Sequence, residues 1–233
     1  MALPLSNTFE TGLADETTIT TGNSGDGTAG DAFDVVFGSP VYDSARSSHG
    51  TLSMRCDTAG VSARYVGYTT SHGAETTMWG RAYVYRTNTP SGDVTNFVRA
   101  LDSSSDIFSI GWYLDGNMYT YIAGLSSPTA IGPVNNNEWI RVEWKVICHA
   151  TTGSTEVRLY AGDSTTEFDS QIRSNVNTGA EIDETQIGST FAQNVGSSTW
   201  VDGFALSDTD WIGPAVEPDP GPTLHVVRSS LRW

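Results

Sequence analysis

Acidic side chains at alternating positions are the first candidates for chemistry in this sequence. Glu181 and Asp183 stand two positions apart in the segment Glu-Ile-Asp-Glu-Thr-Gln, and strand alternation would place both on one face. A retaining glycosidase needs an acid and a nucleophilic carboxylate about 5 Å apart on such a face. This pair is therefore the arrangement that a hydrolase hypothesis has to use.

Histidine, serine and glycine offer no other catalytic arrangement. His49, His72, His149 and His225 are scattered without the paired spacing of a metal site. No serine lies in a nucleophile-elbow motif, and no glycine-rich loop follows a strand and opens a helix. We therefore expect a protein that is not an enzyme.

Three carboxylates raise a calcium hypothesis. Asp26 and Asp31 lie in the glycine-rich segment 22–31, and calcium takes hard oxygen ligands from such loops. Their spacing does not match the twelve-residue calcium loop, which favours a solvated turn. Asp202 has the apolar strand neighbours Trp200 and Phe204, so it either ligates a metal at the rim or accepts hydrogen bonds from a turn, which is favoured. We expect no cofactor, with calcium as the alternative.

Aromatic side chains grouped on strand faces could bind sugars, because a ring stacks on the apolar face of a sugar. The candidates for glycan binding are Trp79, Tyr83, Tyr85, Tyr119 and Tyr121. The alternative is that these rings belong to the core or to the face opposite it, which is the commoner outcome for aromatic residues in strands.

The elements that must position these residues are β-strands. In the segment 138–147, the even positions from Ile140 to Val146 are apolar and alternate with charged residues, which predicts a half-buried strand. The alternation resumes at 155–160, so the two segments predict a hairpin with one face exposed to water. A second hairpin is predicted at Asp115-Gly116, because this dipeptide tolerates the positive φ angles of a tight turn.

About a dozen strands are predicted in all, with frequent turn signals and no helical period. The other predicted strands cover 3–10, 17–21, 32–37, 51–56, 61–69, 76–86, 93–102, 106–114, 118–122, 167–176, 181–188 and 198–207. The predicted fold class is all-β, a two-sheet antiparallel jelly-roll sandwich with an extended C-terminal arm.

The composition argues against several classes of function. The chain has 233 residues with 12 basic and 27 acidic side chains, a formal net charge of −15. Phosphate backbones and anionic bilayers would repel it, so we expect neither a nucleic-acid nor a membrane partner. Cys56 and Cys148 lie in apolar contexts, where a cysteine usually packs as a small hydrophobe, and two cysteines alone leave a disulfide open.

Two parts are predicted along the chain, a body at 1–214 and an arm at 215–233. The arm begins with a proline-spaced stretch at 215–223, which must be extended. Its end is apolar enough to need a surface, on the body or on a neighbour. The residues expected to bind a partner are Leu224, Val226, Val227, Arg228, Leu231, Arg232 and Trp233.

Four stretches carry a resemblance to a known family. They are 7–12 (NTFETG), 30–34 (GDAFD), 138–143 (EWIRVE) and 200–214 (WVDGFALSDTDWIGP). Together they resemble the concanavalin A-like, laminin G-like jelly-roll domains of virion proteins from phages that infect actinobacteria. The similarity spans 7–214 and implies two stacked antiparallel sheets.

The resemblance also bears on catalysis. Hydrolases of this superfamily carry their carboxylates as Glu-x-Asp-x-Glu or Glu-x-Asp-x-x-Glu, but Thr185 and Gln186 stand where the second glutamate would be. We therefore interpret Glu181 and Asp183 as residues on the solvent face of a strand.

The function implied by the resemblance is that of a non-catalytic virion protein on the exterior of a phage particle, assembled in the host cytoplasm. It would be a head decoration, minor capsid or minor tail protein, attached partly through its arm. Its expected partners are major capsid or tail subunits, or further copies of itself as a homo-oligomer. The alternative is a carbohydrate-binding module for a cell-surface polysaccharide, and the two functions can coexist.

Overall fold

The computed structural model describes residues 3–57, 63–89, 95–123, 125, 127–190 and 198–215. Within these ranges it contains fifteen β-strands and no helix. The strands are β1 (Leu5–Asn7), β2 (Val35–Phe37), β3 (Val41–Asp43), β4 (Ser53–Asp57), β5 (Arg64–Tyr68), β6 (Thr77–Arg86), β7 (Thr95–Asp102), β8 (Ser105–Trp112), β9 (Asn117–Ile122), β10 (Thr129–Pro133), β11 (Ile140–Ile147), β12 (Gly153–Ala161), β13 (Glu167–Val176), β14 (Glu184–Ser189) and β15 (Ser198–Ser207). The predicted all-β class is confirmed.

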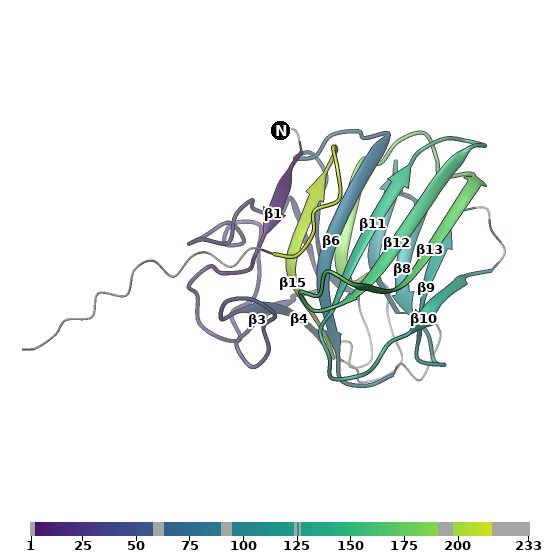
Figure 1. Ribbon diagram of the computed structural model, residues 1–233. Coiled ribbons are helices and arrows are strands. Elements are labelled where there is room, and N and C mark those ends of the chain that lie inside the picture. Colours follow the sequence, from purple (N-terminus) through teal and green to yellow (C-terminus); the bar gives the residue numbers. More distant parts are fainter. Residues whose placement is uncertain are drawn as a thin grey trace, which may run out of the picture.

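Two antiparallel sheets pack face to face to form a sandwich (Figure 1). The eight-stranded sheet has the order β13-β12-β11-β6-β15-β4-β3, and β1 pairs with β15. The seven-stranded sheet has the order β10-β9-β8-β7-β14-β5-β2. Figure 1 shows β6, β11, β12 and β13 side by side in one layer, with β8, β9 and β10 in the layer behind. Neighbouring strands often come from distant parts of the chain, as in jelly-roll sandwiches.

Alternation along the strands builds the core between the two sheets. Val142, Trp144 and Val146 of β11 are completely buried, and the ring of Trp144 stacks against Phe204 of β15 with 6.4 Å between ring centroids. Both predicted hairpins are present, because β11 pairs with β12 and β8 pairs with β9. In the second hairpin Gly116 has a φ of 87°, the left-handed conformation that the dipeptide predicted.

The prediction that the charged face of β11 is exposed to water is wrong. Arg141 and Glu143 are each only 2% exposed and form an ion pair with 2.9 Å between Nε and Oε1. Arg141 also donates hydrogen bonds to the carbonyl oxygens of Gly162 and Ser164, so the segment after β12 covers the pair. Alternation predicts the outward direction of these side chains but not the segment that crosses over them.

Several predicted strand positions are also corrected. The segment 17–21 contributes one bridge, between Thr18 and Val41, in place of a strand. β14 begins at Glu184 and not at 181. β3 lies in a stretch expected to be irregular, and β10 was not predicted because it contains Gly132 and Pro133, two residue types that are depleted in strands.

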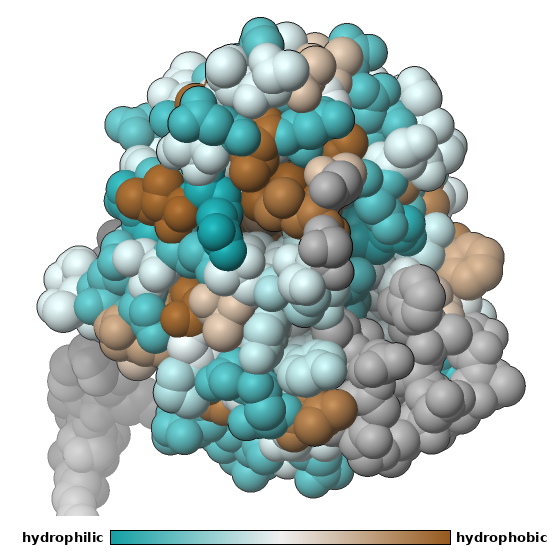
Figure 2. All heavy atoms as spheres, turned by 90° about the vertical axis from the view of Figure 1, so that its right-hand side faces the viewer, coloured by the Kyte–Doolittle hydropathy of each residue, from teal (hydrophilic) through white to brown (hydrophobic). Residues whose placement is uncertain are grey.

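Side chains of β13 and β10 connect the two sheets along one open side of the sandwich. Gln171 donates hydrogen bonds to the carbonyl oxygens of Thr129 and Ala130 at 3.2 and 2.8 Å. On the outward side of β13, Ile172 is 64% exposed and Phe168 is 45% exposed. Figure 2, which is viewed from this side, shows apolar surface gathered in its upper middle among polar surface.

The two cysteines lie in the core of this sandwich. Cys56 and Cys148 are both buried and free, and burial raises the pKa of each thiol to about 12. They pack as small apolar side chains, as expected. Among the described residues, no helix is long and apolar enough to cross a membrane.

Candidate functional site

One row of side chains crosses the outer face of the seven-stranded sheet in register. Gln186 of β14 pairs with Arg99 of β7, Arg99 pairs with Ser109 of β8, and Ser109 pairs with Tyr121 of β9. Directly paired residues of antiparallel strands point to the same face. Because adjacent strands lie about 4.8 Å apart, the face measures roughly 19 Å from β5 to β9.

Aromatic pairs lie at both ends of this row. At one end Phe37 of β2 stacks on Tyr65 of β5 with ring centroids 5.3 Å apart, and Phe37 is 50% exposed. At the other end Tyr119 lies 5.2 Å from Tyr113, and its hydroxyl donates a hydrogen bond to Asp115 at 2.7 Å. Rings held by such contacts lose little freedom when a ligand stacks on them.

We call this surface the seven-stranded face. It comprises Phe37, Tyr65, Arg99, Ser109, Tyr119, Tyr121 and Gln186.

Hydrogen bonds join the polar groups in the middle of the seven-stranded face. Arg99 donates from Nε to Asp106 at 2.7 Å and from Nη1 to Oε1 of Gln186 at 3.2 Å. Gln186 in turn donates to Glu184 at 2.6 Å. The pKa of Tyr65 is raised, mainly by burial and then by the charge of Glu184, so its hydroxyl remains a donor. Two carboxylates accompany one guanidinium, which does not favour an anionic ligand.

A hollow of about 190 Å³ opens on this side of the molecule, between β7, β8 and β9. Asn96, Asp106, Ser109, Tyr121 and Leu125 are among the residues that line it. Its volume is below the range of about 300–1,000 Å³ typical of small-molecule pockets. It therefore suits one unit of an extended ligand, with amide, hydroxyl and carboxylate groups available to bond that unit.

The structure divides the five predicted aromatic residues between the two sheets. Tyr119 and Tyr121 lie on the seven-stranded face and are half-buried. Trp79, Tyr83 and Tyr85 belong to β6 and point to the outer face of the eight-stranded sheet. They therefore do not form one surface.

The β6 rings are mostly occupied by other side chains. Tyr83 is completely buried; its hydroxyl donates to Asp163 at 2.5 Å and accepts a hydrogen bond from the Ala215 amide at 2.8 Å. Its proposed role as a sugar-stacking ring is corrected, because no ring face is free. Trp79 lies under the ammonium group of Lys145 at 4.8 Å. Tyr85 packs on Trp139 and Trp200, with centroids 5.4 and 5.6 Å away.

Asp202 accepts hydrogen bonds from a turn, the favoured of its two predicted roles. Its carboxylate accepts from the amides of Ser48, His49 and Gly203 at 2.7, 2.9 and 2.7 Å. Burial raises its pKa to about 7, and the charge of Glu10 contributes to the same rise. Glu10 accepts from the amides at positions 51 and 52, at 2.7 Å each. The two carboxylates thus hold one loop together.

The carboxylates with a predicted calcium role lie in separate surroundings. Asp202 and Glu10 are bonded to backbone amides, whereas calcium takes oxygen ligands. Asp31 also accepts a hydrogen bond from the Ser6 amide at 2.9 Å, and Asp26 is exposed.

Among the described residues, one group of three acidic side chains has ligand atoms within 4.8 Å of one another, namely Asp15, Glu16 and Asp43. Arg55 donates to both oxygens of Glu16 at 2.7 and 2.6 Å and also contacts Asp43. The guanidinium already supplies positive charge, so this group is an ion-pair network.

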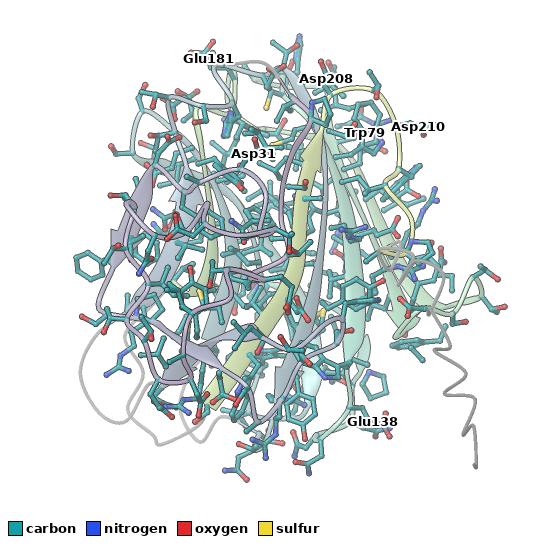
Figure 3. The ribbon with its side chains drawn as sticks, turned by 90° about the vertical axis from the view of Figure 1, so that its left-hand side faces the viewer. Asp31, Trp79, Glu138, Glu181, Asp208 and Asp210 are labelled. Carbon is teal, nitrogen blue, oxygen red and sulfur yellow. The ribbon has the colours of Figure 1, made fainter. Side chains whose placement is uncertain are left out.

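Glu181 and Asp183 precede β14, which corrects the expectation that they lie within a strand. Ile182, between them, forms an isolated bridge with Glu75, and Asp183 accepts a hydrogen bond from the Ser103 amide at 2.9 Å. Figure 3 shows Glu181 at the same end of the sandwich as Asp208, with Glu138 at the opposite end. The two acids therefore lie at one end of the sandwich.

Sequence reasoning missed Phe37, Tyr65, Arg99 and Gln186. Their outward direction was available, since Arg99 alternates with the buried Val98 and Ala100. Their proximity was not, because it depends on which distant strands pair and in what register. The arm residues between Leu224 and Trp233, predicted to bind a partner, lie outside the described residues.

Comparisons with known proteins define the class of the fold. Neither a protein-family model nor a curated protein sequence matches the chain. The solved structures that it resembles are β-sandwich domains, in agreement with a jelly-roll architecture.

Among them, the cellulose-induced protein Cip1 is 14% identical with a TM-score of 0.61, over 91% of this chain and 100% of that one. A Trypanosoma rangeli sialidase is 13% identical with a TM-score of 0.50, over 88% of this chain and 30% of that one. The receptor-binding domain of botulinum neurotoxin C/D mosaic serotype is 11% identical with a TM-score of 0.54, over 88% and 47%. Another sialidase is matched over only 15% of its length. At these identities the likeness shows the fold alone.

Proposed function

We propose that this chain is a non-catalytic carbohydrate-binding domain that binds an extended, uncharged glycan along the seven-stranded face. The observation that carries the proposal is the row of polar side chains in register across the sheet, with aromatic pairs at both ends. Sugar rings stack on aromatic side chains, and their hydroxyl groups bond to fixed polar groups between them.

The charges of the surface support an uncharged ligand. Arg99 is already paired with Asp106, and Glu184 adds a second carboxylate beside Gln186. An acidic polysaccharide would meet this local negative charge as well as the net charge of −15 of the whole chain. The receptor-binding domain among the compared structures agrees with a role in recognition.

Binding to an array of neutral and acidic oligosaccharides tests the proposal, with Tyr65→Ala and Tyr119→Ala as variants. Each ring removed should weaken binding about 2- to 13-fold, because an aromatic contact contributes about 0.5–1.5 kcal/mol beyond its buried area. Tyr85→Ala is the matched control, since it removes a half-buried tyrosine from the opposite sheet.

The control should bind the glycan like the wild type. Binding that survives both Tyr65→Ala and Tyr119→Ala but is lost in Tyr85→Ala would place the site on the wrong sheet and refute the proposal. Release of reducing sugar, abolished by Glu181→Gln, would refute its non-catalytic part.

A second proposal is that the chain is a structural protein of the phage particle exterior, attached partly through the arm at 215–233. Its support is the resemblance of 7–214 to such proteins together with the exposed edge of the eight-stranded sheet. There β13 runs for ten residues, with Ile172 and Phe168 exposed. Unpaired edge strands accept a strand from another chain.

Immunogold electron microscopy on purified phage particles, with an antibody to this protein, tests the second proposal. Label over the head would support decoration of the capsid, and label at the tail tip would support glycan binding at the host surface. Particles without label would exclude a virion protein and leave the carbohydrate-binding domain.

A further inference from the structure

A second, larger hollow lies where the segment 208–214, which follows β15, runs beside β1. Its volume is about 400 Å³, within the range typical of small-molecule sites. Leu5, Leu206 and Ile212 contribute apolar surface, and Ser207 and Thr209 contribute hydroxyl groups. Asp210 also lines the hollow; it is exposed, and its carboxylate accepts a hydrogen bond from the Trp211 amide at 2.8 Å. None of its lining residues belongs to the seven-stranded face, so it is independent of the glycan surface proposed above. Figure 3 shows Asp208 and Asp210 of this segment near Trp79.

The positively charged group at this hollow is Arg81, and only 7% of this residue is exposed. Its Nε donates to the Gly203 carbonyl at 3.0 Å and its Nη1 to the Gly213 carbonyl at 3.2 Å. Within the described part of the chain, its Nη2 has no hydrogen-bond acceptor. A guanidinium held by two of its nitrogens, with the third available, is positioned to bind an oxyanion.

The buried carboxylates near Arg81 are bonded to other groups. The strand register sets Glu143 opposite Arg81, but the Glu143 carboxylate is already bonded to the buried Arg141 at 2.9 Å. Asp202 also acts on Arg81, although its oxygens accept three backbone amides. The carboxylates of Glu143 and Asp202 are therefore both bonded to other donors, and a buried cation is costly without an anion bonded directly to it.

The other lining groups indicate what the anion is attached to. Trp211 lines the hollow, and its ring is held in place by the guanidinium of Arg158 at 3.8 Å. The hydroxyl groups of Ser207 and Thr209 lie 3.1 Å apart. A fixed ring and a pair of hydroxyl groups beside a guanidinium suit a compact ligand with hydroxyl groups of its own.

We propose that this hollow binds an acidic sugar, with a carboxylate or phosphate group on Nη2 of Arg81 and sugar hydroxyl groups on Ser207 and Thr209. The ligand is small because the hollow holds about 400 Å³. Its affinity depends on direct contact with Arg81, because the net charge of −15 opposes the approach of any anion.

Isothermal titration calorimetry of the full chain with glucuronic acid, glucose 6-phosphate, glucose and inorganic phosphate tests this inference. At least one acidic sugar should bind about 10- to 100-fold more tightly than glucose, the range expected for one charge-assisted hydrogen bond. Which of the two binds more tightly distinguishes a carboxylate from a phosphate site. Glucose bound as tightly as both acidic sugars, or inorganic phosphate bound as tightly as glucose 6-phosphate, would overturn the proposal.

Variants locate the binding. Arg81→Gln should reduce the affinity for the acidic sugar to that for glucose, and Ile212→Trp should abolish binding by filling the hollow while keeping the guanidinium of Arg81. Tyr65→Ala, on the seven-stranded face, should leave it unchanged. If Arg81→Gln does not fold, Ile212→Trp decides: acidic-sugar binding that persists in it excludes this hollow as the site.

Discussion

Asp202 is the side chain whose titration should be visible in the stability of the whole domain. Its pKa is raised to about 7, whereas an unfolded aspartate titrates near 3.9. Between these values the folded state binds more protons than the unfolded state. The free energy of unfolding should therefore fall as the pH rises from about 4 to about 7, by about 4 kcal/mol at most from this group.

Chemical denaturation across this pH range, in the presence of a chelator, measures the effect against Asp202→Asn, which should lack most of the fall. An equal fall in the wild type and the variant would contradict the assignment. Repeating the wild-type series with calcium chloride tests whether a cation can replace the amides bonded to Asp202 and Glu10. Because the carboxylates are already bonded to amides, calcium should leave the fall and the melting temperature unchanged; a higher melting temperature would mean that a cation binds there.

Glu143 is the second side chain whose substitution should change the stability of the fold, because its ion pair is buried. Glu143→Gln removes the counter-ion of the buried Arg141 and should lower the free energy of unfolding by about 3–5 kcal/mol. Glu156→Gln is the control, since its pair with Arg158 is partly exposed and should contribute about 1 kcal/mol or less. Urea unfolding of both variants measures the difference, and equal losses would mean that burial of the Arg141 pair has no special effect.

At the scale of the elements, substitutions at two glycines distinguish the effect of packing between strands from the effect of turn geometry. A methyl group on Gly80 of β6 would overlap the indole of Trp144 on β11, whereas nothing lies within 4 Å of such a group on Gly116. Gly80→Ala should therefore destabilise the sandwich by about 3 kcal/mol through overpacking. Gly116→Ala should cost about 1 kcal/mol, because only its positive φ is strained. Thermal unfolding of both variants compares the two losses of stability. A larger loss in Gly116→Ala than in Gly80→Ala would contradict the prediction.

The same elements show which parts of the fold and site the sequence can predict. β13 and β15 were predicted with their observed ends, and the β8–β9 turn was predicted from Asp115-Gly116, because alternation and turn chemistry are local properties. The burial of Arg141 was not predicted, since the segment that covers it follows another strand.

The candidate site depends still more on non-local structure. Tyr119 and Tyr121 were predicted from one strand, but the residues that complete their surface lie on β2, β5, β7 and β14. The register between such strands is set by packing and loop geometry, which short sequence patterns do not contain. For the same reason Arg81 gave no signal as a site residue: its role depends on Gly203 and Gly213, more than a hundred positions away.

At the scale of the whole molecule, the proposed functions divide the surface. The seven-stranded face would bind an uncharged glycan, the hollow at Arg81 would bind an acidic sugar, and the edge at β13 would meet another protein. The sandwich core lies between them, so a ligand at one sheet need not disturb the other. The arm would then serve attachment without contributing to the folding of the body.

Deletion of 216–233 tests this division of labour. The body should stay folded, with a melting temperature within about 2 °C of the full chain, because the contacts that tie down the segment after β15 lie before the cut. These contacts are the Arg81 bond to Gly213, the Arg158 stack on Trp211, and the Ala215 amide bonded to Tyr83. Calorimetry measures the first part, and cosedimentation with phage particles measures the expected loss of attachment. A full chain with Arg228→Ser and Arg232→Ser separates the charge of the arm from its apolar residues. If the truncated chain loses its cooperative unfolding transition, the arm is part of the folding unit and its separate role in attachment is excluded.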